Sequence, residues 1–467
     1  MNSPENELFD ITKKAAEEGN AEEQYTLGCM YYDGLIIPKD LKKSFEWMKK
    51  SAEQGYPDAQ SALGLMYFSG EIVPPDYHKT IEWLTKSADQ GCVKAEVSLG
   101  SMYYEGEIVP QDLSKVVELW GRAAEKGQPD AQYHLGTMYY NGVGVKQDGL
   151  KAISLWEKAA EQDHIYAQIN LSSAYTTGEV VPRDILKIFK YLEKPIEQHN
   201  PQAQYNLAMI YYDGEILPQD YSKAFKLFKD SADQDYPMAQ FYLGMMYATG
   251  KSVPVDNERA AELLEKSAKQ GCAEAIFHLA FLYSRGEGVQ QDDAKALELW
   301  KKAADLGYDW ACYHLALMHF HGLQVNQSYD EAFNLWKKAA DKGHAPSQFN
   351  LGHMYFHGHG RPKDSEKAVV WYTKAADLGH PEAQYTLGSM YCDGMGVSRD
   401  LNLGIDYLKK SAEQDYAPAL VNLGLLYANG EGLPIDYQTA KEYFRRACEL
   451  GDKGGCFNYN EMIKNGY

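Results

Sequence analysis

Residues 383–394 have the sequence AQYTLGSMYCDG, and this stretch decides the fold. Four of its apolar residues have the i, i+4, i+7, i+8 spacing of one face of an α-helix: Ala383, Leu387, Met390 and Tyr391. Gly388 places a small residue beside this apolar stripe, which indicates that another helix approaches closely. Gly394 follows where a left-handed residue commonly ends a helix. The stretch therefore predicts a helix that ends at a glycine.

The same motif recurs every 36 residues, with no insertion or deletion between copies. Its leucine occurs twelve times, at Leu27, Leu63, Leu99, Leu135, Leu171, Leu207, Leu243, Leu279, Leu315, Leu351, Leu387 and Leu423. A strict period of this length is typical of a solenoid, in which each unit packs only on its neighbours. Solenoids usually present a long surface to a partner, so the period itself favours a binding function.

A second helix is predicted after each motif. Its N-cap is an aspartate in eleven repeats and Ser328 in the twelfth. Residues 292–304 are an example, with Trp300 as a bulky apolar anchor. The second helix ends at a glycine in most repeats, and elsewhere at a residue type that tolerates positive φ: Asp163, His199, Asp235 or Asp415. Each repeat is therefore expected to form a helix–turn–helix.

The fold class that follows is all-α: a solenoid of twelve 36-residue repeats with a single capping helix at each end. We expect capping helices in residues 1–19 and 451–467, and one continuous solenoid of repeats in residues 20–450. Ser3 is predicted to cap the first helix, because Pro4 suits its first position. Pro195 removes a backbone donor near the end of a second helix, which predicts a bend near residues 170–200.

Composition narrows the possible partners. The formal charge is −20, from 46 basic and 66 acidic residues. Nucleic acids bind basic surfaces, so this balance argues against them and favours a protein or peptide with a basic surface. No apolar run is long enough for membrane insertion, and the polar N-terminus does not resemble a Sec signal peptide. We therefore expect a cytoplasmic location, with translocation into a host by a non-Sec route as the alternative.

The cysteines do not suggest a disulfide framework. There are seven of them, an odd number, and although Cys92 and Cys272 share a position of the repeat five units apart, no position holds a cysteine in every repeat. Cys29, Cys312 and Cys392 fall on predicted helices, where we expect them to act as small apolar residues.

The complete motif has the pattern A-x-x-x-L-G-x-M-Y-x-x-G, followed by D-x-x-K-A-x-x-x-W-x-K-A-A-x-x-G, and it resembles the Sel-1-like repeat, a relative of tetratricopeptide repeats. This resemblance implies a right-handed α/α superhelix whose first helices line the concave side. It also implies an adaptor or scaffold that binds other proteins, as family members do in signalling, protein quality control and host–microbe contact. One cysteine-rich branch is linked to β-lactam binding or hydrolysis, but its disulfide in every repeat has no counterpart in these cysteines.

A binding face is predicted on the first helices, at the positions two and one before the motif leucine and two, five and six after it. Aromatic residues are common anchors of interfaces, and asparagine can bond to the backbone of an extended peptide. The candidate protein-binding residues at these positions are Tyr32, Phe68, Tyr104, His134, Tyr140, Asn170, Asn206, Tyr212, Tyr242, Phe320, Asn350 and Phe356. The alternative is that many of these rings pack between adjacent repeats.

Histidines concentrate in residues 314–380, where eight of the thirteen lie. His353 and His357 are four residues apart on one predicted helix, the spacing that presents two imidazoles to one metal. His321 has the position of His357 in the preceding repeat. These three residues are the candidate zinc ligands, and the alternative is that they are scattered polar substitutions without a cofactor.

The leading functional hypothesis is a non-enzymatic scaffold or adaptor that holds a protein or peptide in a concave groove. Two alternatives keep the same mode of binding: an inhibitor or immunity-type protein that sequesters a toxin or enzyme, and a secreted effector that binds a host protein. A further alternative is an enzyme, either metal-dependent through the histidine cluster or β-lactamase-like. Enzymes need titratable groups that converge in a pocket, and the sequence shows such a group only at the histidine cluster.

Overall fold

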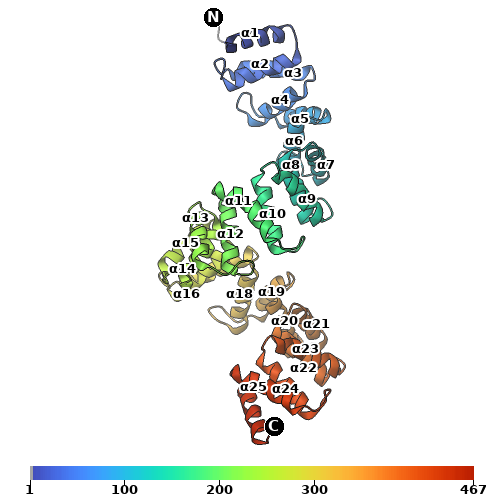
Figure 1. Ribbon diagram of the computed structural model, residues 1–467, viewed down its shortest axis with the longest axis vertical. Helices are drawn as coiled ribbons and strands as arrows, with labels where there is room; N and C mark the ends of the chain where they lie inside the picture. Colours follow the sequence, from blue (N-terminus) through green and yellow to red (C-terminus); the bar gives the residue numbers. More distant parts are fainter. Residues whose placement is uncertain (1–3) are drawn as a thin grey trace. The chain divides into compact units, whose positions relative to one another are not determined.

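The computed structural model describes residues 4–467, so the predicted Ser3 cap lies outside the described part of the chain. Within that part there are 26 α-helices and no strand (Figure 1). The predicted all-α solenoid of helix–turn–helix repeats is confirmed. Helices α1 (Pro4–Glu17) and α26 (Lys453–Lys464) stand before and after the twelve repeats.

The first helices of the repeats carry the motif leucines. They are α2 (Ala21–Asp33), α4 (Pro57–Ser69), α6 (Val93–Glu105), α8 (Pro129–Asn141), α10 (Ile165–Thr177), α12 (Pro201–Asp213), α14 (Pro237–Thr249), α16 (Ala273–Arg285), α18 (Asp309–His321), α20 (Ala345–His357), α22 (Pro381–Asp393) and α24 (Ala417–Asn429).

The second helices alternate with them along the chain. They are α3 (Leu41–Glu53), α5 (Tyr77–Asp89), α7 (Leu113–Glu125), α9 (Gly149–Ala160), α11 (Ile185–Glu197), α13 (Tyr221–Ala232), α15 (Asn257–Lys269), α17 (Asp293–Asp305), α19 (Tyr329–Ala340), α21 (Ser365–Asp377), α23 (Leu401–Glu413) and α25 (Tyr437–Glu449).

The helix ends follow the local signals in the sequence. Gly394 ends α22 with φ 73° and ψ 33°, a left-handed conformation that costs glycine little. At the start of α7 the carboxylate of Asp112 accepts a hydrogen bond from the backbone N–H of Lys115 at 3.1 Å. The four residues that replace glycine after second helices all have positive φ, namely Asp163 (64°), His199 (55°), Asp235 (61°) and Asp415 (56°). The predicted helix–turn–helix boundaries are therefore confirmed.

The chain divides into two compact units, Met1–Leu227 and Phe228–Tyr467. Within each unit the helices pack on their neighbours in chain order, as α3 does on α2 and α4, and α21 on α20 and α22. The division falls inside α13. Helix α11 continues through Pro195 to Glu197, and the bend near residues 170–200 stays a prediction.

The apolar core lies between successive helices and is built from neighbouring repeats. One cluster, for example, joins Trp120, Ala131, Leu135 and Met138 of α7 and α8. The motif leucine Leu387 is completely buried, and so is the alanine one turn before it, Ala383. Apolar burial of this kind supplies most of the driving force for packing, and here it occurs between neighbouring repeats along each unit.

A line of polar contacts joins one repeat to the next, and we call it the glutamine ladder. Gln384, three residues before its motif leucine, donates its side-chain N–H to the carbonyl of Ala376 in the preceding second helix at 3.1 Å. Its own oxygen accepts from Gln414 at 2.8 Å. The same pair of contacts occurs at Gln60, which donates to Ala52 at 3.2 Å and accepts from Gln90 at 2.8 Å. These buried amides are thus satisfied between repeats.

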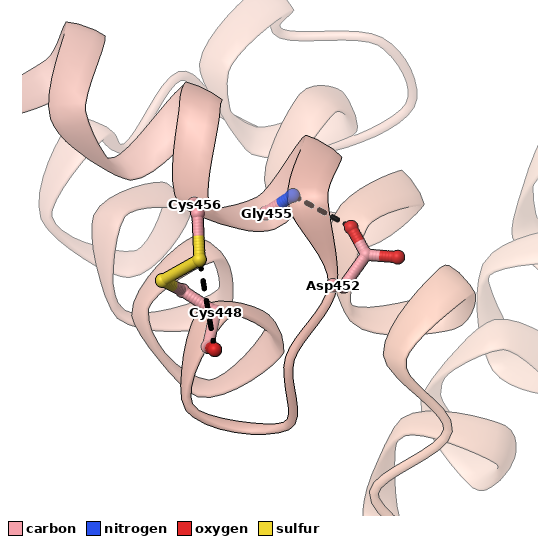
Figure 2. The surroundings of a disulfide bond; sticks show 4 residues. All are labelled: Cys448, Asp452, Gly455 and Cys456. Carbon is pink, nitrogen blue, oxygen red and sulfur yellow. Dashed lines mark hydrogen bonds between the residues drawn. A yellow bond between two sulfur atoms is a disulfide. The ribbon is translucent and has the colours of Figure 1, made fainter.

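The sequence did not predict the disulfide that joins Cys448 of α25 to Cys456 of α26 (Figure 2). Cys456 has the ladder position of Gln384 two repeats earlier, and Cys448 has the position of Ala376. The Sγ of Cys456 lies 3.6 Å from the carbonyl oxygen of Cys448, the position to which a glutamine would donate its side-chain N–H. The bond is a covalent replacement for the last contact of the ladder.

None of the helices in residues 4–467 has the length and apolar character needed to cross a bilayer.

Candidate protein-binding face

The first helices expose a recurring set of side chains on the side opposite the buried leucine. At the positions one before the leucine and two, five and six after it, every residue is exposed or half-buried. We call these four positions the first-helix face. The fifth predicted position, two before the leucine, belongs to the core in several repeats, where it is occupied by Ser61, Ile169, Phe241 and Phe277. It is buried there because the side chain packs toward the next repeat, as Phe277 does on Tyr308 at 5.3 Å between ring centroids.

Three cavities open on this face at one and the same register. Cavity 1 lies between α2 and α4 and has a volume of about 400 Å³; cavity 2 lies between α6 and α8 with about 280 Å³; cavity 3 lies between α22 and α24 with about 230 Å³. Each is lined by the positions two, five and six after one leucine, and by those one before and two and six after the next. These residues are Cys29, Tyr32, Asp33, Ala62, Leu65 and Ser69 in cavity 1; Ser101, Tyr104, Glu105, His134, Thr137 and Asn141 in cavity 2; and Ser389, Cys392, Asp393, Asn422, Leu425 and Asn429 in cavity 3.

Several of the candidate rings rest on the bulky anchor of a second helix. Trp120 lies between Tyr104 and His134, with centroid distances of 5.5 and 5.0 Å. Both flanking rings also line cavity 2, so each has one side against the tryptophan and the other toward the cavity. Tyr140 lies in the same way on Trp156 at 5.2 Å. Each of these rings thus packs between helices and is also partly exposed on the first-helix face.

The same arrangement occurs in the second unit. Phe320 packs on Trp336 at 5.4 Å, and Tyr242 stacks on Phe228 at 5.3 Å. Phe356 is half-buried on α20. Of the twelve candidate residues, Tyr32 and Phe68 meet at cavity 1, and Tyr104 and His134 meet at cavity 2. The others line none of the three cavities: Tyr140, Asn170, Asn206, Tyr212, Tyr242, Phe320, Asn350 and Phe356.

The candidate asparagines lie against the preceding repeat. Asn206 donates its amide N–H to the hydroxyl of Ser173 at 3.1 Å. The side-chain amides of Asn170 and Asn350 lie close enough to the phenol groups of Tyr133 and Tyr313, respectively, to oppose the rise that burial causes in the pKa of these tyrosines. An asparagine amide has more than one donor and acceptor, so these contacts orient the side chain and leave it capacity for a further partner.

Acidic side chains mark the rims of the cavities. Asp33, Glu105 and Asp393 share the position six after the leucine. Glu71 and Glu431 come from the loops that follow α4 and α24, and they also line cavities 1 and 3. Burial raises the pKa of the thiols of Cys29 and Cys392 at cavities 1 and 3, so these groups are neutral at pH 7. The cavities therefore combine an uncharged interior with an anionic rim.

The candidate zinc ligands form part of an aromatic cluster. The imidazoles of His353 and His357 have centroids 4.2 Å apart, and His359 lies 5.7 Å from His353. His321 packs edge-on against Phe320 at 5.0 Å. Burial lowers the pKa of His353 to about 4, with the neighbouring His357 and His359 adding to the effect. Within residues 4–467 no group of three His, Cys, Asp or Glu residues is placed to hold a metal ion.

Sequence reasoning missed some residues of the cavities. Met48 and Trp120, from second helices, reach cavities 1 and 2, and Arg399 enters cavity 3 from the loop after α22. A pattern taken from the first helices alone could not include them. One signal could have identified Trp120. A bulky anchor recurs at its position of the second helix and packs beside a glycine of the motif, so its ring lies directly behind the first-helix face.

The sequence matches the model of the Sel1 repeat in twelve consecutive segments, at residues 24–56, 57–92, 93–128, 129–164, 165–199, 201–236, 237–272, 273–308, 311–344, 345–380, 381–416 and 417–452. The chain belongs to the Sel1-repeat family. Sel1-repeat proteins are in general scaffolds for protein interactions, and the arrangement of paired helices in this member agrees with that architecture.

Three solved structures are similar to between 47 and 98% of this chain. The crystal structure of c5321, a protective antigen of uropathogenic Escherichia coli, is 30% identical, covers 98% of this chain and 91% of its own, and has a TM-score of 0.53. A Sel1 repeat protein from Oxalobacter formigenes is 34% identical over 66% of this chain and 90% of its own, with a TM-score of 0.46. The immunity protein Pa5087 of Pseudomonas aeruginosa is 18% identical over 47% of this chain and 83% of its own, with a TM-score of 0.36. No curated protein matches the sequence.

Proposed function

We propose that this Sel1-repeat protein is a non-enzymatic scaffold that captures a segment of a partner protein on its first-helix face. The observation that carries the proposal is the repetition of cavities 1, 2 and 3 at one register of the face. A site for a single small substrate usually occurs once in a chain, whereas equivalent cavities that recur between first helices in both units suit the side chains of protein segments.

The chemistry of the face supports a protein partner. Tyr32, Phe68 and Tyr104 present large rings that are 40, 41 and 42% exposed. Rings of this kind supply contact area at low entropic cost, and they are enriched at interfaces. The net charge of −20 favours a partner segment with a basic surface and disfavours nucleic acid. We place this activity in the cytoplasm, as the sequence predicted.

The proposal is tested by partner capture with the full chain. Immobilised protein is incubated with a lysate of the organism that encodes it, and the retained proteins are quantified by mass spectrometry. The test variant is Tyr32→Ser, Phe68→Ser and Tyr104→Ser together, which removes three rings of the face. The control variant is Leu150→Ser and Leu186→Ser, which removes two leucines that are 67 and 83% exposed on second helices.

We expect the triple variant to lose at least one protein that the wild type and the control retain in stoichiometric amount. Thermal unfolding and helical circular dichroism establish that each variant is folded. If the retained proteins are the same for all three forms, the face is not the binding surface and the proposal fails.

A further inference from the structure

Cavity 1 is lined mainly by apolar side chains. Leu65, Phe68 and Tyr32 line it and are 37, 41 and 40% exposed, and Met48 and Ile72 are also part of its wall. Its volume of about 400 Å³ lies within the range of pockets that hold organic ligands, about 300–1,000 Å³. Exposed apolar surface in a concave site gains free energy when an apolar group covers it.

Two carboxylates stand at the rim of this cavity. Asp33 is the last residue of α2 and Glu71 lies in the loop after α4, and both are exposed. In the described chain, residues 4–467, neither of them forms an ion pair. Lys39 is close to the cavity, but its ammonium lies over the ring of Tyr32 at 5.1 Å from the centroid. The rim therefore offers two negative charges on either side of an apolar opening.

Cavity 3 provides an internal comparison. Asp393 and Glu431 have the same positions in their repeats as Asp33 and Glu71. In cavity 3, however, the guanidinium of Arg399 is part of the lining, and its Nε donates to the carbonyl of Cys392 at 2.8 Å. A positive charge of the protein itself thus offsets the acidic rim of cavity 3. Lys39 has the repeat position of Arg399 at cavity 1, but its ammonium lies over the ring of Tyr32 and it is not among the residues that line the cavity.

We propose that cavity 1 binds a segment of a partner protein in which a bulky apolar side chain stands next to lysine or arginine. The apolar side chain enters between Leu65 and Phe68, and the flanking cation pairs with Asp33 and Glu71. This inference rests on the proposed function, because it names the partner chemistry of one cavity on the same face. Charge pairs at a rim contribute mainly specificity, while the buried apolar group contributes affinity.

The test uses three fluorescein-labelled peptides with Gly-Ser flanks and the cores Lys-Leu-Lys, Glu-Leu-Glu and Lys-Ala-Lys. Binding to the full-length protein is measured by fluorescence anisotropy at low and high salt. The test variant is Asp33→Asn with Glu71→Gln. The matched control is Asp89→Asn with Glu46→Gln, which makes the same change in net charge at two exposed carboxylates of the second helices α5 and α3, outside the first-helix face.

We expect the wild type to prefer Lys-Leu-Lys over Glu-Leu-Glu by about tenfold, which corresponds to about 1.4 kcal/mol. The preference for lysine falls in the Asp33/Glu71 variant and at high salt, because exposed charges are screened. The preference for leucine over alanine persists in that variant. The Asp89/Glu46 control keeps both preferences.

A second readout reports where the peptide sits. Cys29 lines cavity 1 and Cys392 lines cavity 3 at a related position of the repeat. We expect Lys-Leu-Lys peptide to slow the alkylation of Cys29 by iodoacetamide several-fold and to leave Cys392 unchanged, as measured by peptide mass spectrometry.

Equal loss of lysine preference in both double variants would overturn the inference, because it would show a response to net charge alone. Equal affinity for the leucine and alanine peptides, or no binding of Lys-Leu-Lys, would also overturn it. These results leave the proposed function standing, since that proposal fails only if partner capture is insensitive to the loss of the face rings.

Discussion

The residue after each motif leucine controls how closely the tryptophan of the second helix approaches. Gly100 and Gly136 occupy this position where Trp120 and Trp156 donate their indole N–H to backbone carbonyls of the first helix, at 3.3 and 3.2 Å. Where the residue is alanine, at Ala280 and Ala316, the indole nitrogens of Trp300 and Trp336 have no partner within residues 4–467. One methyl group therefore decides whether the indole reaches the backbone.

Gly100→Ala is expected to lower the free energy of unfolding by about 2 kcal/mol, through overpacking and the lost hydrogen bond. The added Cβ would lie 2.4 Å from Nε1 of Trp120. Gly121→Ala in α7 is the control, because its Cβ would meet nothing within 4 Å. Helix propensity then predicts a gain of about 0.5–1 kcal/mol. Urea denaturation measures both, and a gain for Gly100→Ala would refute the packing argument.

Glu96 is a charged replacement in the glutamine ladder. It is fully buried, and its carboxylate pairs with Nζ of Lys126 at 3.0 Å and Nε of Arg122 at 3.1 Å. Glu96→Gln is expected to cost about 1–2 kcal/mol, because it leaves two cations without their carboxylate partner; these cations are partly exposed, which limits the cost. Adding Lys126→Gln restores a glutamine pair like Gln54 and Gln24, 2.7 Å apart, and should recover most of the loss. A double-mutant cycle by urea denaturation gives the coupling free energy between Glu96 and Lys126, and additive effects of the two substitutions would contradict the predicted recovery.

At the scale of elements, α26 is held to the rest of the protein by the Cys448–Cys456 disulfide as well as by packing (Figure 2). We expect reduction to increase hydrogen exchange in residues 453–464 and to leave α20 and α22, which do not pack on α26, unchanged. Cys448→Ala with Cys456→Gln rebuilds the contact seen between Gln384 and Ala376 at 3.1 Å. This variant should keep α26 protected in the presence of reductant. An intact mass without the loss of two hydrogens would show that the disulfide does not form.

The helices were predictable from the sequence, because their signals are local. Asp112 caps α7 and Gly394 ends α22 through contacts within a few residues, and Asp163 takes the positive φ expected of a glycine substitute. The disulfide was not predictable in this way. It required the knowledge that Cys448 and Cys456 replace an alanine and a glutamine that touch across two helices, which is tertiary information.

The candidate site was likewise predictable only where its signals are local. The register of the face follows from the turn of an α-helix, so Tyr32, Phe68, Tyr104 and His134 were placed at cavities that the structure contains. The position two before the leucine was misplaced in several repeats, since burial there depends on the neighbouring first helix. Arg399 was missed because the residue before the N-cap aspartate varies between repeats, for example Lys39, Gln111 and Arg399. Whether these residues bind a partner stays a prediction.

At the scale of the whole molecule, histidines with a lowered pKa are unevenly distributed between the two units. Burial is the main cause that lowers the pKa of His134 in the first unit, and of His278, His314, His344, His353 and His380 in the second. The unfolded chain then binds more protons than the folded one below about pH 6.5. The stability contributed by these neutral histidines is complete above that pH and is lost as the pH falls toward the folded values, about 4 for His353.

Between pH 7.5 and 6 we therefore expect the second unit, Phe228–Tyr467, to lose about 2 kcal/mol of stability, and the first unit less. Hydrogen exchange of peptides from each unit, corrected for the intrinsic effect of pH, measures the two separately. His353→Gln should reduce the loss in the second unit. Equal losses in both units would contradict this assignment.

The glutamine ladder has a consequence for how such a chain can change. Gln60 and Gln384 make the same contacts in different units, so a junction between repeats is nearly interchangeable with another. Removing one complete period of 36 residues brings together two surfaces that already match. Unequal recombination within the gene can therefore shorten or lengthen the molecule in whole steps, and natural variants should differ in size by multiples of one repeat.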